Sequence, residues 1–267
     1  RLNYGWNGRL FAEATAGITG SNQFSRNRFL PVGSAALSYI LSTEPYLKIR
    51  ASGGHLGYNP NGNYLLYKTA WTPSGDYMLG NNNNTNAHIT QLARLGNERI
   101  GWVTQNEGNI GIDGSLFRNR LSFGADFFFE KRDNIITSLS SRYSDLIGNH
   151  LPVFNYGSIR NYGAELEVIW KDQAGDGDFK YEIGANMTLT RNENIKVNEI
   201  DSIESYRSSI GHPSSGIYGL KSQGLFGKDV KQNGHPKQMF GYYTDGDIAY
   251  EDMNGDGVID DKDNTYL

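Results

Sequence analysis

The chain has 267 residues, a formal net charge of −4 and no cysteine. The lack of cysteine excludes disulfide scaffolds and thiolate metal sites, and the slightly acidic balance implies no basic surface for nucleic acid. Glycine (33) and tyrosine (17) are abundant, which favours β-structure with many turns, and no apolar run reaches the length of about 18 residues that a transmembrane helix needs.

Four long segments place apolar residues at every second position. In the first of them, Leu10, Ala12, Ala14, Ala16 and Ile18 share one face, while Phe11, Glu13 and Thr15 lie on the other. A period of two predicts β-strands, and these runs exceed the usual strand of about five or six residues. A tilted strand needs about 9–11 residues to cross a bilayer. The four segments are 9–19, 121–130, 162–170 and 179–190.

The connections between strands alternate between short and long. Short turns are predicted at Asn7-Gly8, around Ser42–Pro45, at Arg118-Asn119 and within 171–178. Long polar segments are 20–29, 55–98, 131–161 and 191–216. This alternation is typical of an outer-membrane barrel, which has short periplasmic turns and long extracellular loops. We therefore predict an all-β, antiparallel transmembrane barrel to which this chain contributes roughly eight to ten strands.

A soluble β-sandwich is the alternative, because it also buries one face of each strand. The side chains of Leu10, Phe127 and Leu189 distinguish the two folds: they would pack against a second sheet in a sandwich and form an outward belt in a barrel. Aromatic residues near strand ends would then form interfacial girdles, although each could equally be an ordinary core residue. These aromatics are Tyr39, Trp102, Phe128, Trp170 and Phe179.

Residues 252–263 match the twelve-residue calcium loop D-x-[DN]-x-[DN]-G, with Gly257 at the sharp turn. A hard cation takes six to eight oxygens, so we predict a structural Ca²⁺ site there. Position twelve is aspartate rather than glutamate, and no amphipathic helix flanks the loop, which argues against a paired EF-hand sensor. The alternative is an acidic turn without an ion. The predicted ligands are Asp252, Asn254, Asp256, the carbonyl of Val258, Asp260 and Asp263.

Several blocks along the chain resemble, in order, the SusC/RagA-type TonB-dependent outer-membrane transporters. The most specific is NYGSIRNYGAELE at 155–167, and GDIAYEDMNGDGVIDDKD at 246–263 matches the family pattern almost residue for residue. Further blocks are 1–4 with 10–14, LKIRASGG at 47–54, NIGIDGSLFRNR at 109–120 with the strand after it, and IYGLKSQGLF at 217–226. The resemblance covers almost the whole chain.

The resemblance implies part of a barrel of about 22 strands, with a calcium-loop-like insertion at 245–265, in the bacterial outer membrane. It also implies a plug domain that contacts TonB, a SusD-like surface lipoprotein that acts as a lid, and oligosaccharide or peptide as cargo. The plug is not in this sequence, so we expect the chain to be part of a longer protein. The competing interpretations are a secreted carbohydrate-binding sandwich with a calcium site, and a passive porin.

The segment 55–98 contains aromatic residues among asparagines, which is a composition suited to stacking on sugar rings and hydrogen bonding to hydroxyls. The same tyrosines could instead hold the loop together or contact the lid. The candidate substrate-binding residues are Tyr58, Tyr64, Tyr67, Trp71 and Tyr77.

Charged residues occupy the strand face opposite the apolar stripe, where we expect them to line the lumen. They are Glu13, Lys48, Arg50, Asp126, Glu130, Glu165, Glu167, Lys180 and Glu182. Their spacing is what strand alternation produces. The sequence has no G-x-S-x-G elbow, no Walker A loop and no H-x-x-x-H pair, so we predict that the protein is not an enzyme.

Overall fold

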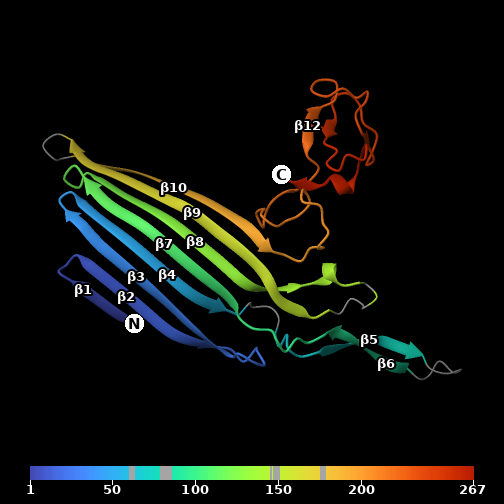
Figure 1. Ribbon diagram of the computed structural model, residues 1–267, viewed down its shortest axis with the longest axis horizontal. Coiled ribbons are helices and arrows are strands. Elements are labelled where there is room, and N and C mark those ends of the chain that lie inside the picture. Colours follow the sequence, from blue (N-terminus) through green and yellow to red (C-terminus); the bar gives the residue numbers. More distant parts are fainter. Residues whose placement is uncertain (60–63, 79–85, 145, 147–150, 175–178) are drawn as a thin grey trace. The chain divides into compact units, whose positions relative to one another are not determined.

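The computed structural model describes residues 1–59, 64–78, 86–144, 146, 151–174 and 179–267. These residues divide into two compact units, Arg1–Asn198 and Glu199–Leu267. The first unit contains an eight-stranded antiparallel sheet with the order β1-β2-β3-β4-β7-β8-β9-β10 (Figure 1). Its strands are β1 (Leu2–Trp6), β2 (Leu10–Gly20), β3 (Phe29–Thr43), β4 (Tyr46–Tyr58), β7 (Val103–Leu116), β8 (Leu121–Ser138), β9 (Val153–Ala174) and β10 (Phe179–Lys196).

Cross-strand register shows how the alternating sequence produces two different faces. Residues directly opposite each other on adjacent strands point to the same side of a sheet. One such row is apolar throughout and runs Tyr4, Ala12, Leu37, Ala51, Ile110, Phe127, Ala164, Leu189. The next row is largely polar and runs Gly5, Phe11, Ser38, Arg50, Gly111, Asp126, Glu165, Thr188. We call the two sides the apolar face and the polar face.

The apolar face is open. Ile110, Phe127 and Leu189 are 67%, 57% and 60% exposed, whereas the inner faces of a sandwich bury such side chains. The sandwich interpretation is therefore wrong, and the predicted all-β antiparallel fold is confirmed.

Tight turns join the strands at one end of the sheet. Asn7 and Gly8 both have positive φ (50° and 60°) between β1 and β2, as a type I′ hairpin requires. Phe117, Arg118 and Asn119 (φ 53°, 58° and 66°) turn the chain between β7 and β8. The turns predicted at 7–8, around 42–45 and at 118–119 are thus confirmed, while 175–178 lie outside the described residues. β10 ends at the opposite end of the sheet, where the long connections lie (Figure 1).

The strands extend further than the alternation indicated. β8 continues to Ser138 and β9 begins at Val153, so much of the predicted loop 131–161 is strand. Near this end the apolar face itself becomes polar, with Lys131 opposite Arg160. Backbone pairing between β8 and β9 continues there although apolar and polar residues no longer alternate. The predicted loop 55–98 likewise contains a hairpin of β5 (Ala70–Met78) and β6 (Asn86–Arg94).

A small hydrophobic core lies among the long connections rather than within the sheet. It contains Phe24, Leu66, Ile100 and Trp102, with Leu30 packed against it. The rings of Phe24 and Trp102 meet edge to face at 5.0 Å, and the Trp102 indole N–H donates to the Asn27 carbonyl at 2.9 Å. Trp102 therefore is not a girdle residue, and Phe128 lies on the polar face, opposite Gly163. Tyr39, Trp170 and Phe179 lie on the apolar face near the tight turns, as a girdle requires.

The second unit is held together by three short two-stranded ladders. Its core includes Phe226, Ala249 and Ile259, and the Phe226 ring stacks on Tyr243 at 5.0 Å. Residues 217–227 contain β11 and β12, which pair with β16 and β14 of this unit instead of the large sheet. Its elements are β11 (Tyr218–Gly219), β12 (Ser222–Leu225), β13 (Lys237–Gln238), β14 (Ile248–Tyr250), β15 (Val258–Ile259), a 3₁₀ turn (Asp261–Asp263) and β16 (Thr265–Tyr266). Within the described part of the chain, we find no helix long and apolar enough to span a membrane.

Candidate functional site

The polar face is organised around an ion-pair cluster at its centre. The Arg50 Nε donates to Asp113 Oδ2 at 3.1 Å, and the guanidinium also donates to Asp126. Lys48 Nζ lies 3.7 Å from Asp113 Oδ2. Gly111 leaves room for this arrangement, because a Cβ there would lie 2.7 Å from Asp126 Oδ1 and 2.8 Å from Arg50 Cζ. The cluster joins strands β4, β7 and β8 through charge-assisted hydrogen bonds.

Asp113 was missing from the predicted lumen charges. Ile110 and Ile112 alternate with Gly111 and Asp113, which indicates a strand with Asp113 on the polar face. The glycines in this strand make the alternation harder to recognise.

The remaining predicted charges also share the polar face according to the strand register. Glu13 pairs with Arg1 at 2.8 Å, Glu130 with Arg132 at 2.9 Å and Glu182 with Lys171 at 3.0 Å. Glu165 lies directly opposite Asp126, while Glu167 and Lys180 are exposed further along the same face. The polar face is therefore lined by charges of both signs, as suits a surface in contact with water or with a polar domain.

The five candidate substrate-binding aromatics do not form one cluster. Tyr58 ends β4, with the Arg132 guanidinium 5.5 Å from its ring centroid. Tyr64, Trp71 and Tyr77 are 63%, 65% and 59% exposed, whereas Tyr67 is half-buried.

A bulge in the β5–β6 hairpin separates two of these aromatics. Trp71 lies opposite Leu92, but the register shifts between Pro73 and Asp76, and Tyr77 then lies opposite Ala87. Since Leu92 and Ala87 are five positions apart on β6, an odd offset, Trp71 and Tyr77 point to opposite faces of the hairpin. They can act on one ligand only if it wraps around the hairpin.

The acidic loop 252–263 uses its carboxylates to hold its own backbone. Asp252 accepts the N–H groups of Gly255 (2.7 Å) and Gly257 (2.8 Å), both of which have positive φ. Asn254 Oδ1 accepts the N–H of Asp256 at 2.9 Å. Asp256 Oδ1 in turn accepts the N–H of Val258 at 2.9 Å. These contacts fold the loop tightly around its glycines.

Asp263 is the centre of this loop and is completely buried. Its Oδ1 accepts the N–H groups of Met253 (2.9 Å) and Asn254 (3.4 Å), and its Oδ2 accepts that of Asp260 (2.9 Å). Asp260 closes a reciprocal cap by accepting the N–H of Lys262 at 2.7 Å. A position-twelve carboxylate that accepts three N–H groups has little capacity left for bidentate binding of a cation.

Across the described residues, no group of three or more histidine, aspartate or glutamate side chains is placed to hold a metal ion. The hydroxyl of Tyr206 donates to the Lys262 carbonyl at 2.9 Å, and partial burial raises the pKa of Tyr206. This hydrogen bond ties the Tyr206 side chain to the backbone of the loop. Calcium binding by 252–263 stays a prediction.

Comparison with known proteins places this sheet in a family. Residues 1–265 match the family described as TonB dependent receptor-like, beta-barrel. The chain therefore belongs to the TonB-dependent receptor barrels, which reside in the bacterial outer membrane, and the relatives it resembles include SusC. This is a transporter family, in agreement with the prediction that the protein is not an enzyme.

Among curated proteins, the chain is 25% identical to the TonB-dependent receptor SusC of Bacteroides thetaiotaomicron over 98% of its length. It is 24% identical to the TonB-dependent receptor P39 of Formosa agariphila over 97% of its length. It spans only 27% and 28% of these two relatives.

Among solved structures, the RagAB peptide importer in its closed-closed state matches with a TM-score of 0.72 and 19% identity, covering 99% of this chain and 29% of that one. The open-open state of the same importer gives a TM-score of 0.73 with 99% and 28% coverage. At this identity the match concerns the fold, and it covers both compact units.

Proposed function

We propose that the complete protein imports a nutrient across the outer membrane with energy delivered through TonB. The observation that carries this proposal is the pair of adjacent cross-strand rows, one apolar and one polar, that run across the whole eight-stranded sheet. The apolar row suits contact with lipid and the polar row suits a hydrated lumen. TonB itself would contact a plug region, which this chain does not include.

For the cargo we propose an oligosaccharide. Trp71 and Tyr77 on the β5–β6 hairpin are exposed and offer aromatic surfaces for stacking on sugar rings. A peptide is the second candidate, supported by the fold match to the RagAB peptide importer.

We further propose a SusD-like surface lipoprotein as partner. β10 ends at the end of the sheet with the long connections, so residues 199–267 follow a strand that finishes on what we infer to be the extracellular side. The exposed aromatic side chains of that unit, including Phe240 and Tyr242, would suit contact with a protein partner.

The test is growth and uptake by a strain that carries the complete gene or a deletion of it. We expect the deletion to abolish uptake of one class of cargo, and purified complete transporter to bind that class by calorimetry. Loss of peptide uptake with intact glycan uptake would reverse the order of the two cargo candidates. Unchanged uptake of both classes would contradict an import function.

For the acidic loop we propose a structural role within residues 199–267, with Ca²⁺ as its predicted ligand. Asp256→Ala should remove any calcium-dependent protection of 245–265 from proteolysis, whereas Asp261→Ala, a neighbouring exposed carboxylate outside the predicted ligand set, should leave it intact. Equal protection of the wild-type protein with calcium and with chelator would show that the loop needs no ion.

A further inference from the structure

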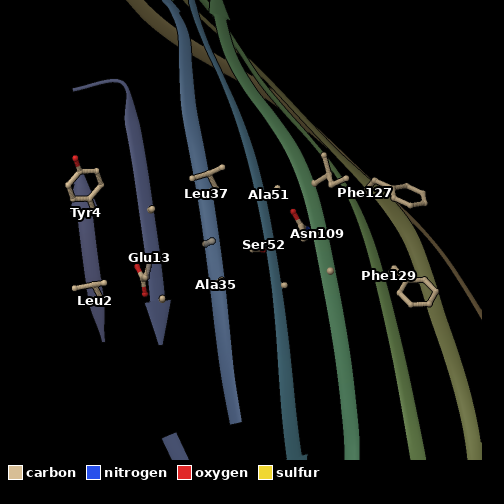
Figure 2. A pocket seen from close by; sticks show the side chains of 16 residues that line it. Leu2, Tyr4, Glu13, Ala35, Leu37, Ala51, Ser52, Asn109, Phe127 and Phe129 are labelled. Atoms are coloured by element: carbon tan, nitrogen blue, oxygen red, sulfur yellow. The ribbon is translucent and has the colours of Figure 1, made fainter. Parts of the chain in front are cut away.

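The apolar face carries a hollow that crosses most of the sheet. It has a volume of about 700 Å³. Tyr4 and Leu2 border it on one side and Phe127 and Phe129 on the other, with Ala35 and Ala51 between them (Figure 2). The hollow arises because small residues line its floor where neighbouring positions carry large ones. The floor residues include Ala12, Ala14, Ala35, Ala51, Gly53 and Gly108.

This hollow faces lipid rather than the transport path. Tyr4 and Phe127 belong to the same row of cross-strand partners as Leu37 and Ile110, and Leu2 and Phe129 belong to a second row on the same face. The ion-pair cluster around Arg50 lies on the other face. A polar cargo has nothing to bind there. An acyl chain would fill the hollow and gain the apolar contacts that the small residues leave unmade.

A row of cations begins immediately beyond the hollow. Lys131 is two residues after Phe129 on β8, a rise of roughly 7 Å, and it lies directly opposite Arg160 on β9. Arg191 on β10 is exposed and lies opposite Tyr162, the aromatic residue two positions from Arg160. All three cations share the apolar face, at the level where its side chains change from apolar to charged.

Two of the cations are paired but remain accessible. Lys131 Nζ lies 3.1 Å from Asp133 Oδ2, and the Lys131 side chain is 42% exposed. Arg160 bonds to Glu193, stays 41% exposed and stacks near Tyr162, with its guanidinium carbon 5.8 Å from the ring centroid. With Arg191, the row carries three positive charges against two negative ones. Lys131 and Arg160 lie directly opposite each other, where like charges repel, so an additional anion beside them would reduce that repulsion.

We propose that this surface binds an anionic outer-membrane lipid, with its acyl chain in the hollow and its phosphate among Lys131, Arg160 and Arg191. The order of side chains along this surface matches a lipid from its tail to its headgroup. The apolar hollow would hold the acyl chain, Phe129 and Tyr162 lie at the boundary, and the three cations lie where the phosphate would be. Arginine binds phosphate through two parallel N–H groups, and basic pockets next to a membrane-spanning surface recognise lipid headgroups.

The test uses the complete transporter reconstituted in nanodiscs that contain equal amounts of phosphatidylglycerol and phosphatidylcholine. After mild delipidation, native mass spectrometry counts the retained lipids. We expect wild type to retain phosphatidylglycerol preferentially. Arg191→Gln should weaken that preference roughly fivefold, and the triple variant Lys131→Gln, Arg160→Gln, Arg191→Gln should remove it.

The matched control removes one cation from each of the same three strands on the polar face: Arg132→Gln, Lys171→Gln and Lys180→Gln. This control should keep the preference for phosphatidylglycerol. Heat-modifiable migration in gels verifies that every variant is a folded barrel. A triple variant that retains phosphatidylglycerol like wild type, or a control that loses it equally, would overturn the proposal.

A second variant tests the hollow independently of charge. Gly108→Leu fills the hollow without strain, because a Cβ there would have its nearest neighbour, the Ser52 carbonyl oxygen, at 3.9 Å. It should lower retention of both lipids, whereas Gly124→Leu on the polar face, with its nearest neighbour at 3.6 Å, should not. Binding of free inorganic phosphate to the three cations without any preference for phosphatidylglycerol would show a soluble-anion site and refute the lipid assignment.

Discussion

An arginine placed at Ala14 tests the assignment of the two faces most directly. Ala14 is the central member of the apolar stripe of β2, with Leu10 and Ile18 at its ends, and it is exposed. Replacing alanine removes almost no packing, so the change in free energy of unfolding reports the environment of the added charge. Its neighbour Thr15 is also exposed and lies opposite Ser34 on the polar face, so Thr15→Arg is the matched control.

The expected loss of free energy of unfolding in Ala14→Arg follows from the position of Ala14 along its strand. Four residues separate Ala14 from each end of the stripe, which is roughly 13 Å along the strand and roughly 10 Å in depth at a tilt of about 40°. An arginine near the middle of the bilayer costs about 2–4 kcal/mol, whereas one at the interface costs about 0–1 kcal/mol. Thr15→Arg should cost less than about 1 kcal/mol, because the lumen is hydrated.

The assay is urea unfolding of the complete transporter in lipid vesicles, followed by tryptophan fluorescence and by heat-modifiable migration. We expect the urea midpoint to fall clearly for Ala14→Arg and to change little for Thr15→Arg. Equal midpoints for the two variants, or a larger loss for Thr15→Arg, would refute the conclusion that the apolar rows face lipid.

Three further predictions concern the other sites. Arg50→Leu leaves Asp113 and Asp126 without their shared cation and should lower the free energy of unfolding by about 1–3 kcal/mol, measured by the same urea assay; an unchanged midpoint would mean that solvent or a lumen domain replaces the guanidinium. Asp263→Ala removes the acceptor of three backbone N–H groups and should destabilise 199–267 by about 3 kcal/mol or more, seen as faster proteolysis of that unit alone; a wild-type cleavage rate would show that water satisfies these groups. Trp71→Ala should weaken cargo binding by about 1 kcal/mol in calorimetry without changing the urea midpoint, and equal affinity would exclude this residue from the cargo site.

The strands and turns of the sheet were predictable wherever one face is apolar and the other polar. Leu121–Phe129 and its neighbours show this period clearly, and Asn7-Gly8 is a strong local turn signal. The same signal fails near the long connections, where β8 continues with charged residues on both faces and β9 carries Arg160 on the apolar face. Backbone pairing continues there through irregularities of register at Ile135 and Ile136, and side-chain periodicity does not indicate it.

The acidic loop shows a different limit. Its residue pattern is visible in the sequence, but the pattern describes only which oxygens are available. In the folded chain Asp263 bonds to three N–H groups and Asp252 to two, so much of this capacity stabilises the turn itself. Sequence spacing cannot show which carboxylate oxygens accept backbone N–H groups and which are left to bind a cation.

The sequence by itself determined the all-β class, the two-faced strands, the tight turns at 7–8 and 118–119, and the resemblance to an outer-membrane transporter family, because each depends on local period or on ordered motifs. Only the tertiary structure decided which strands pair and in what register. That register brings Asp113 to Arg50, places Trp71 and Tyr77 on opposite sides of a bulged hairpin, and aligns Lys131 with Arg160 beyond the apolar hollow. Packing against Phe24 buries Trp102. These contacts join residues far apart in the chain, and pairing geometry rather than composition creates them.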